Sequence, residues 1–156
     1  MKSICSSPAK KQLVLSHLKC FDESKLPMLY STIGSWTKLL SYVSLKVNTN
    51  DLIPHICCSI HVIEKDGMNV LNKECIDRTG PDTAKFVVDL FKSAVHDAVD
   101  LGCGKHKNLD ICHQHMKKEV QYFDELISIG KNESFKFTPI VPLLNLAKRL
   151  DENNSE

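Results

Sequence analysis

Apolar residues recur every three or four positions through most of this chain, the spacing that places them on one face of a helix. The clearest example starts near Pro27, where a missing backbone N–H is tolerated in a first helical turn. Its apolar positions follow one another in steps of four and three residues: Leu29, Ile33, Trp36, Leu40, Val43 and Val47. The pattern therefore predicts a long amphipathic helix here.

A second apolar stripe follows the turn residues Thr79-Gly80-Pro81-Asp82. Thr79 has the side chain of a helix N-cap, and Asp82 stands three residues later, as in a capping box. The stripe consists of Ala84, Val87, Val88, Phe91, Ala94, Val95, Ala98 and Leu101, and Gly102 supplies a C-terminal stop. We predict that the interior seam of this helix is structural, and that loss of the Phe91 side chain is costly if it is fully buried. A small cost would instead indicate a peripheral helix or a ligand or partner surface.

Weaker periodicity predicts the remaining helices. They are expected at about residues 11–20, from Ile53 to a stop near Gly67, in a short segment through Leu71 and Cys75, at residues 108–128 and at residues 140–150. Residues 1–9 are expected to form a loose arm and residues 151–156 a disordered tail. The fold class that follows is all-α: one domain, residues 1–156, built as an irregular bundle of five to seven helices.

Seven cysteines lie along these predicted helices, which favours a disulfide-stapled protein from an oxidising compartment. The disulfide candidates are Cys20, Cys57, Cys58, Cys75, Cys103 and Cys112. Spacing allows many connectivities. If the chain makes a hairpin near Gly67, one member of the adjacent Cys57-Cys58 pair lies opposite Cys75 and is expected to form a disulfide with it. We then favour a Cys103–Cys112 disulfide and a bond from Cys20 to the remaining member of the adjacent pair. Cys5 is then left over, free or linking two chains as a covalent dimer.

Charge and targeting signals narrow the class of protein. Lys and Arg number 20 against 19 Asp and Glu, so no basic footprint for nucleic acid exists, and no apolar run is long enough to span a membrane. Asn132 and Asn153 begin glycosylation acceptor triplets. The first residues lack the apolar stretch of a signal peptide, so the secreted, extracellular location that we predict requires a signal already removed.

Candidate chemistry is weak throughout. Only two residues separate Cys75 from Arg78, whereas a phosphatase loop needs five. His113 and His115 point about 200° apart on a helix and cannot share a metal ion. Neither a nucleophile motif nor a glycine-rich phosphate loop is present. We therefore predict a non-enzymatic protein with no catalytic residues, no metal and no cofactor.

The chain loosely resembles secreted arthropod cysteine-rich, all-helical proteins of unassigned function. The likeness covers about Cys20–Cys112. It rests on a cysteine near a helix start, a Cys-helix-turn-Cys hairpin, a long amphipathic helix, and the segments Leu101-Gly102-Cys103 and Leu109-Asp110-Ile111-Cys112. It implies a fold type and secretion. The adjacent Cys57-Cys58 pair also occurs in plant lipid-transfer proteins, but the remaining spacings do not fit that family.

Two binding functions compete. The first is binding of a macromolecular partner or extracellular assembly, with the hydroxyl-rich side of the helix after Pro27 (Ser31, Ser35 and Ser41) as the contact face. The second is carriage of a small apolar ligand or lipid in a helical cavity, against the apolar face formed by Phe86, Leu90, Phe91 and Val95.

Overall fold

The computed structural model describes residues 7–80, 82–131 and 140–153, without the side chains of residues 10, 94–101 and 153. Within these residues the structure is helical and contains no strand, which confirms the predicted all-α class. The elements are α1 (Pro8–Leu18), η1 (Glu23–Lys25), α2 (Leu26–Lys46), η2 (Thr49–Asp51), α3 (Leu52–Thr79), α4 (Asp82–Gly102), α5 (Leu109–His115), α6 (Lys117–Lys131) and α7 (Ile140–Asn153).

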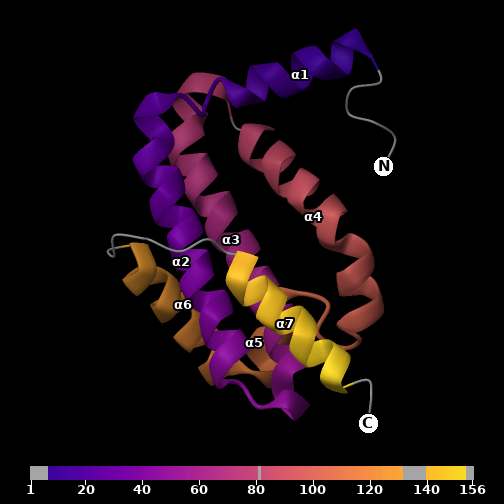
Figure 1. Ribbon diagram of the computed structural model, residues 1–156. Coiled ribbons are helices and arrows are strands. Elements are labelled where there is room, and N and C mark those ends of the chain that lie inside the picture. The colour runs from indigo at the N-terminus through magenta and orange to yellow at the C-terminus, as the bar shows by residue number, and fades with distance from the viewer. Residues whose placement is uncertain (1–6, 81, 132–139, 154–156) are drawn as a thin grey trace.

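Helix α3 is the axis of the arrangement, and α2 and α4 both pack along it (Figure 1). Helix α6 and helix α7 pack on α2, which makes the lower part of the molecule a layered bundle. Helix α1 extends from one end of this bundle, at the edge of the molecule.

The predicted stop near Gly67 is wrong, because α3 runs unbroken through this residue for 28 residues. Gly67 is buried beneath Trp36, and a Cβ added to it would lie 3.3 Å from an atom of the indole ring. The neighbouring Asp66 accepts a 2.9 Å hydrogen bond from Nε1 of the same ring. Gly67 therefore permits close packing between α2 and α3 instead of ending a helix.

Four other boundaries differ from prediction. The single helix expected over residues 108–128 is interrupted at Met116, whose φ of −135° is not helical, and no glycine or proline marks the break. Helix α1 begins at Pro8, inside the expected arm, and α7 continues to Asn153, inside the expected tail. Thr79 ends α3, its hydroxyl donating to the Cys75 carbonyl, and Gly80 terminates the helix with a φ of 79°.

Three disulfides join the six predicted cysteines, but in a connectivity that differs from the favoured scheme. The bonds are Cys20–Cys75, Cys57–Cys103 and Cys58–Cys112, with Cα–Cα distances of 5.3, 5.6 and 5.7 Å. The scheme failed because it required a hairpin at Gly67. In a continuous α3, 18 residues separate Cys57 from Cys75, roughly 27 Å at 1.5 Å per residue, so they cannot bond. Cys5 lies outside the described residues.

The core divides into two clusters of buried side chains. The larger fills the lower bundle between α2, α3 and α6, with Phe123 and Leu39 fully buried. The smaller surrounds the Cys20–Cys75 bond, where Leu71 of α3 meets Ala84 and Val88 of α4. The small cluster therefore joins α3, α4 and the chain after α1, and it contains fewer buried side chains than the larger one.

Candidate functional site

The apolar arc of α4 is wider than its contact with α3. Ala84 and Val88 are buried against α3, with 1% and 4% of their surface exposed. Leu90 and Phe91 remain 40% and 37% exposed. At about 100° per residue, Val88 and Leu90 point roughly 160° apart, so one neighbouring helix cannot cover both. Phe91 is therefore not fully buried, which was the condition for a large structural cost at this residue.

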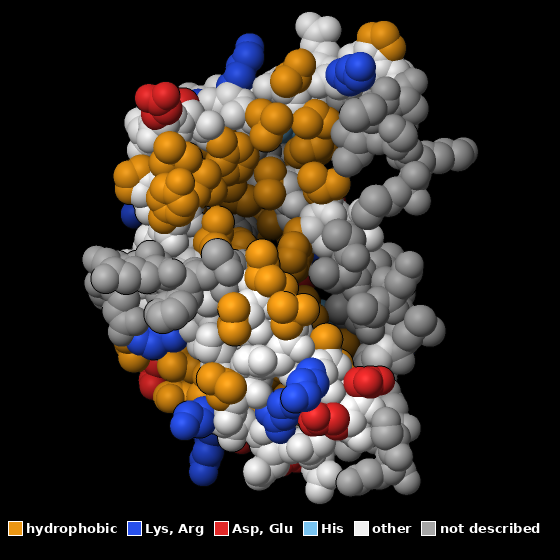
Figure 2. Space-filling view, viewed as in Figure 1, with side chains coloured by type: hydrophobic (Ala, Val, Ile, Leu, Met, Phe, Trp, Pro, Cys, Tyr) orange, Lys and Arg blue, Asp and Glu red, His pale blue; other side chains and the backbone are white. Residues whose placement is uncertain are grey.

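Hydrophobic side chains gather beside α4 on the face shown in Figure 2. They cover the upper parts of α1 and α2, line a hollow between α4 and the α2–α3 pair, and continue onto α7 below. The blue and red side chains of charged residues lie around the edges of this region. We call the exposed hydrophobic side chains of α4 and α7 the apolar face and define it by Leu90 and Phe91 of α4 and Ile140, Val141, Leu143 and Leu144 of α7.

Helix α7 contributes one wall because it is apolar on two sides. Leu146, 5% exposed, anchors the helix in the larger core cluster. Arg149 fixes its other end by donating hydrogen bonds of 2.8 and 2.7 Å to the carbonyls of Ser44 and Val47, where α2 ends. Leu144, in contrast, is 65% exposed. The packing that holds α7 thus leaves its second apolar side uncovered.

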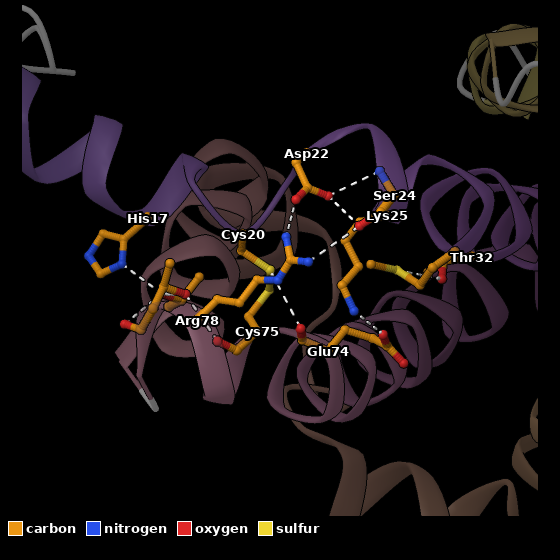
Figure 3. The surroundings of a disulfide bond; sticks show 12 residues. His17, Cys20, Asp22, Ser24, Lys25, Thr32, Glu74, Cys75 and Arg78 are labelled. Atoms are coloured by element: carbon orange, nitrogen blue, oxygen red, sulfur yellow. Dashed lines mark hydrogen bonds and ion pairs between the residues drawn. A yellow bond between two sulfur atoms is a disulfide. The ribbon is translucent and has the colours of Figure 1, made fainter.

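The end of α1 packs against the start of α4. The imidazole of His17 stacks on the ring of Phe86, with centroids 4.4 Å apart. Its Nδ1 lies 2.9 Å from the Thr83 hydroxyl (Figure 3). Phe86 is consequently half-buried. The Cys20–Cys75 disulfide lies beside this contact and ties the chain after α1 to α3.

Polar residues form ion pairs between the chain after α1 and the end of α3, on the other side of the disulfide from His17 (Figure 3). Asp22 forms an ion pair with Arg78, and hydrogen bonds from Ser24 and then Arg78 lower the pKa of its carboxyl. Lys25 lies 2.7 Å from Glu74 and lowers the pKa of that carboxyl through a hydrogen bond. These pairs position η1 against the end of α3.

The hydroxyl-rich side of α2 is an internal contact, which corrects its prediction as a contact face for a partner. Ser35 is fully buried, and its hydroxyl donates a 2.7 Å hydrogen bond to the Thr32 carbonyl. The Ser31 hydroxyl donates a 2.9 Å hydrogen bond to the carbonyl of Lys131, the last residue of α6. Ser41 is half-buried. Small hydroxyl side chains allow α6 to approach α2 closely.

A second hollow lies between α2 and α3 and has a volume of about 290 Å³. Its lining mixes apolar and charged side chains: Met28, Ser31, Thr32, Asn69, Val70, Lys73, Glu74 and Lys131. This lining differs from the purely apolar cavity expected of a carrier.

The histidine-rich corner does not form a metal site in the part of the chain described. No group of three or more His, Cys, Asp or Glu side chains there could hold an ion. His106 is 6% exposed, and its ring centroid lies 6.1 Å from that of His115. Burial, followed by the positive charge of Lys105, lowers the pKa of the His106 imidazole.

Three further predicted residues lie beyond what the structure describes. The side chain of Val95 and the whole of Asn132 are outside it, and Asn153 is placed only as the last residue of α7. Among the described helices, none is long and apolar enough to cross a membrane.

No protein-family model matches this chain, and no curated protein or solved structure is similar to it.

Proposed function

We propose that this protein is a secreted, non-enzymatic carrier that binds a ligand with a long apolar chain, such as a fatty acid, against the apolar face. The observation that carries the proposal is the exposure of Leu90 and Phe91 on α4. Helix α4 is one of the helices beside a hollow lined by hydrophobic side chains (Figure 2). Covering Leu90 and Phe91 would contribute on the order of 1–2 kcal/mol per side chain, since burial of apolar surface contributes about 25 cal/mol per Å².

The scaffold supports this function because covalent bonds, in addition to packing, hold it in place. Cys57–Cys103 ties the loop after α4 to α3, and Cys20–Cys75 ties the opposite end of the α3–α4 pair to the chain after α1. With both ends anchored, an incompletely packed apolar face can persist without collapse. Three intramolecular disulfides are also typical of proteins from oxidising compartments, which supports secretion. Relationship to the secreted arthropod proteins and glycosylation at Asn132 and Asn153 remain part of this proposal.

A second candidate function is binding of a protein partner through the same face. The observation that favours it is the openness of the face, because pockets for small molecules bury most of the ligand surface. Leu90 at 40% exposure and Leu144 at 65% resemble side chains of a contact surface more than those of a closed cavity.

Titration with a fluorescent fatty-acid probe tests the first function directly. The wild type is compared with Leu90→Ser/Phe91→Ser and with the control Leu45→Ser, a residue 65% exposed on α2. We expect saturable binding by the wild type and control, and about tenfold weaker binding by the double variant, the equivalent of about 1.4 kcal/mol. Melting temperatures well above the assay temperature for all three proteins ensure that the comparison is made between folded proteins.

Absence of saturable probe binding, or equal binding by the double variant, would contradict the carrier function. The partner function then has its own test, selection of helical peptides from a displayed library. Enriched peptides that bind the wild type but not Leu90→Ser/Phe91→Ser would support that function.

A further inference from the structure

We propose that α1 docks this protein onto the surface of an anionic phospholipid membrane. The proposal concerns where the protein binds, and it depends on α1 alone, independently of the ligand proposed for the apolar face.

The first observation is a separation of charge along the chain. Residues 1–21 contain four of the 20 Lys and Arg residues and none of the 19 Asp and Glu residues, so the remainder of the chain is net negative although the whole carries +1. Lys11 and Lys19 are exposed, and neither pairs with a carboxylate among the described residues. Each lysine near an anionic lipid surface contributes about 1 kcal/mol of attraction.

The second observation is that exposed leucines accompany these lysines. Leu13, Leu15 and Leu18 are 51%, 60% and 50% exposed. Exposed leucines can insert at the boundary between lipid headgroups and acyl chains, while neighbouring lysines reach back to the headgroups.

The orientation of α1 leaves Leu15 available. His17 holds the helix by stacking on Phe86 of α4. Leu15 precedes His17 by two residues and therefore points about 160° away from it, toward the side opposite α4. Figure 1 shows α1 at the edge of the molecule, where a flat surface can approach it. The helix thus has one side anchored to the body and another side that carries apolar and basic groups.

Two acidic groups near the anchor are already in ion pairs: Asp22 with Arg78, and Glu74 with Lys25. Glu23 and Asp82 are exposed at the same corner. An anionic surface therefore has to approach from the side of α1 that carries Lys11 and Leu15, away from these two carboxylates. An acidic protein surface would complement the lysines but would not by itself account for the exposed leucines.

Co-sedimentation with lipid vesicles tests the proposal on the full chain. We expect binding to phosphatidylcholine vesicles containing about one-third phosphatidylserine, much weaker binding to phosphatidylcholine alone, and a decrease as salt screens the charges. Leu15→Ser/Leu18→Ser and Lys11→Glu/Lys19→Glu should each reduce the bound fraction at least about tenfold. Leu45→Ser and Lys46→Glu, exposed positions on α2, are the matched controls and should bind as the wild type does.

The proposal is overturned if the wild type does not bind anionic vesicles, if it binds neutral vesicles equally well, or if either α1 variant binds like the controls. Its failure is distinguishable from failure of the carrier function. The α1 variants should retain fatty-acid probe binding, and Leu90→Ser/Phe91→Ser should retain vesicle binding.

Discussion

Gly130 of α6 lies directly against the backbone of Ser35 in α2, so that a Cβ at residue 130 would stand 2.6 Å from the Ser35 Cα. The atom it would meet belongs to the backbone of a buried helix and cannot move aside as a flexible side chain would. This contact explains why α2 carries hydroxyl groups on the side that faces α6. Larger residues there would hold the two helices apart.

Gly130→Ala is expected to destabilise the protein by about 1–3 kcal/mol, because overpacking a close helix contact costs more than the improved helix propensity of alanine contributes. The measurement is urea-induced unfolding followed by circular dichroism. Gly102→Ala is the matched control, since a Cβ there would meet nothing within 4 Å. Equal stability of the two variants would show that α2 and α6 are not in such close contact.

Phe123→Ala and Phe91→Ala should differ strongly although they remove the same side chain. Phe123 is fully buried in the larger core cluster, so its loss should cost about 3–5 kcal/mol. Phe91 is 37% exposed on α4, and its loss should cost on the order of 1 kcal/mol. The comparison uses thermal unfolding under identical conditions. A large cost at Phe91 would mean that α4 is packed more completely than the structure shows.

Opening the Cys20–Cys75 bond should loosen the upper part of the molecule selectively. Removing a native disulfide typically costs 2–5 kcal/mol, and the small cluster around this bond has few other contacts to replace it. Hydrogen exchange of Cys20→Ser/Cys75→Ser should accelerate in α1 and the start of α4 while α6 remains protected. Uniform acceleration across all helices would indicate a single cooperative unit instead.

Cys5→Ser should fold normally and retain three disulfides, because the other six cysteines are already paired with one another. If the wild type forms a covalent dimer, this change should abolish it. Mass spectrometry of unreduced protein after proteolysis gives the connectivity. Recovery of a peptide that links Cys5 to another cysteine of the same chain would contradict the observed pairing.

The buried His106 should make stability fall on acidification. Burial lowers the folded-state pKa of His106 below its unfolded value, so the folded protein favours the neutral ring. The stability that this provides is fully present above the unfolded pKa and is lost as the pH falls through the folded pKa. Melting temperatures at about pH 7.5 and pH 5 should therefore differ more for the wild type than for His106→Gln. The same difference in both proteins would show that other groups cause the pH dependence.

Much of the candidate site could be anticipated from the chain, because the apolar arc of α4 is visible in its periodicity. Phe86, Leu90 and Phe91 were identified on that basis as a ligand face. The exposure of these side chains could not be predicted, because an apolar stripe does not reveal how many neighbouring helices will cover it. The contribution of α7 was missed for a related reason: Leu143 and Leu144 continue an apolar pattern that looks the same whether one or both sides are buried.

The sequence by itself determined the helical class, the long helices α2 and α4 and the set of six bonded cysteines, because periodicity and thiol chemistry are local properties. Only the tertiary structure decided which cysteines pair, that Gly67 permits packing without ending α3, and that Ser35 is inside while Leu90 is outside. Each of these depends on which helix becomes the neighbour of which. That choice follows from shape and packing between residues far apart in the chain, and no spacing along the sequence encodes it.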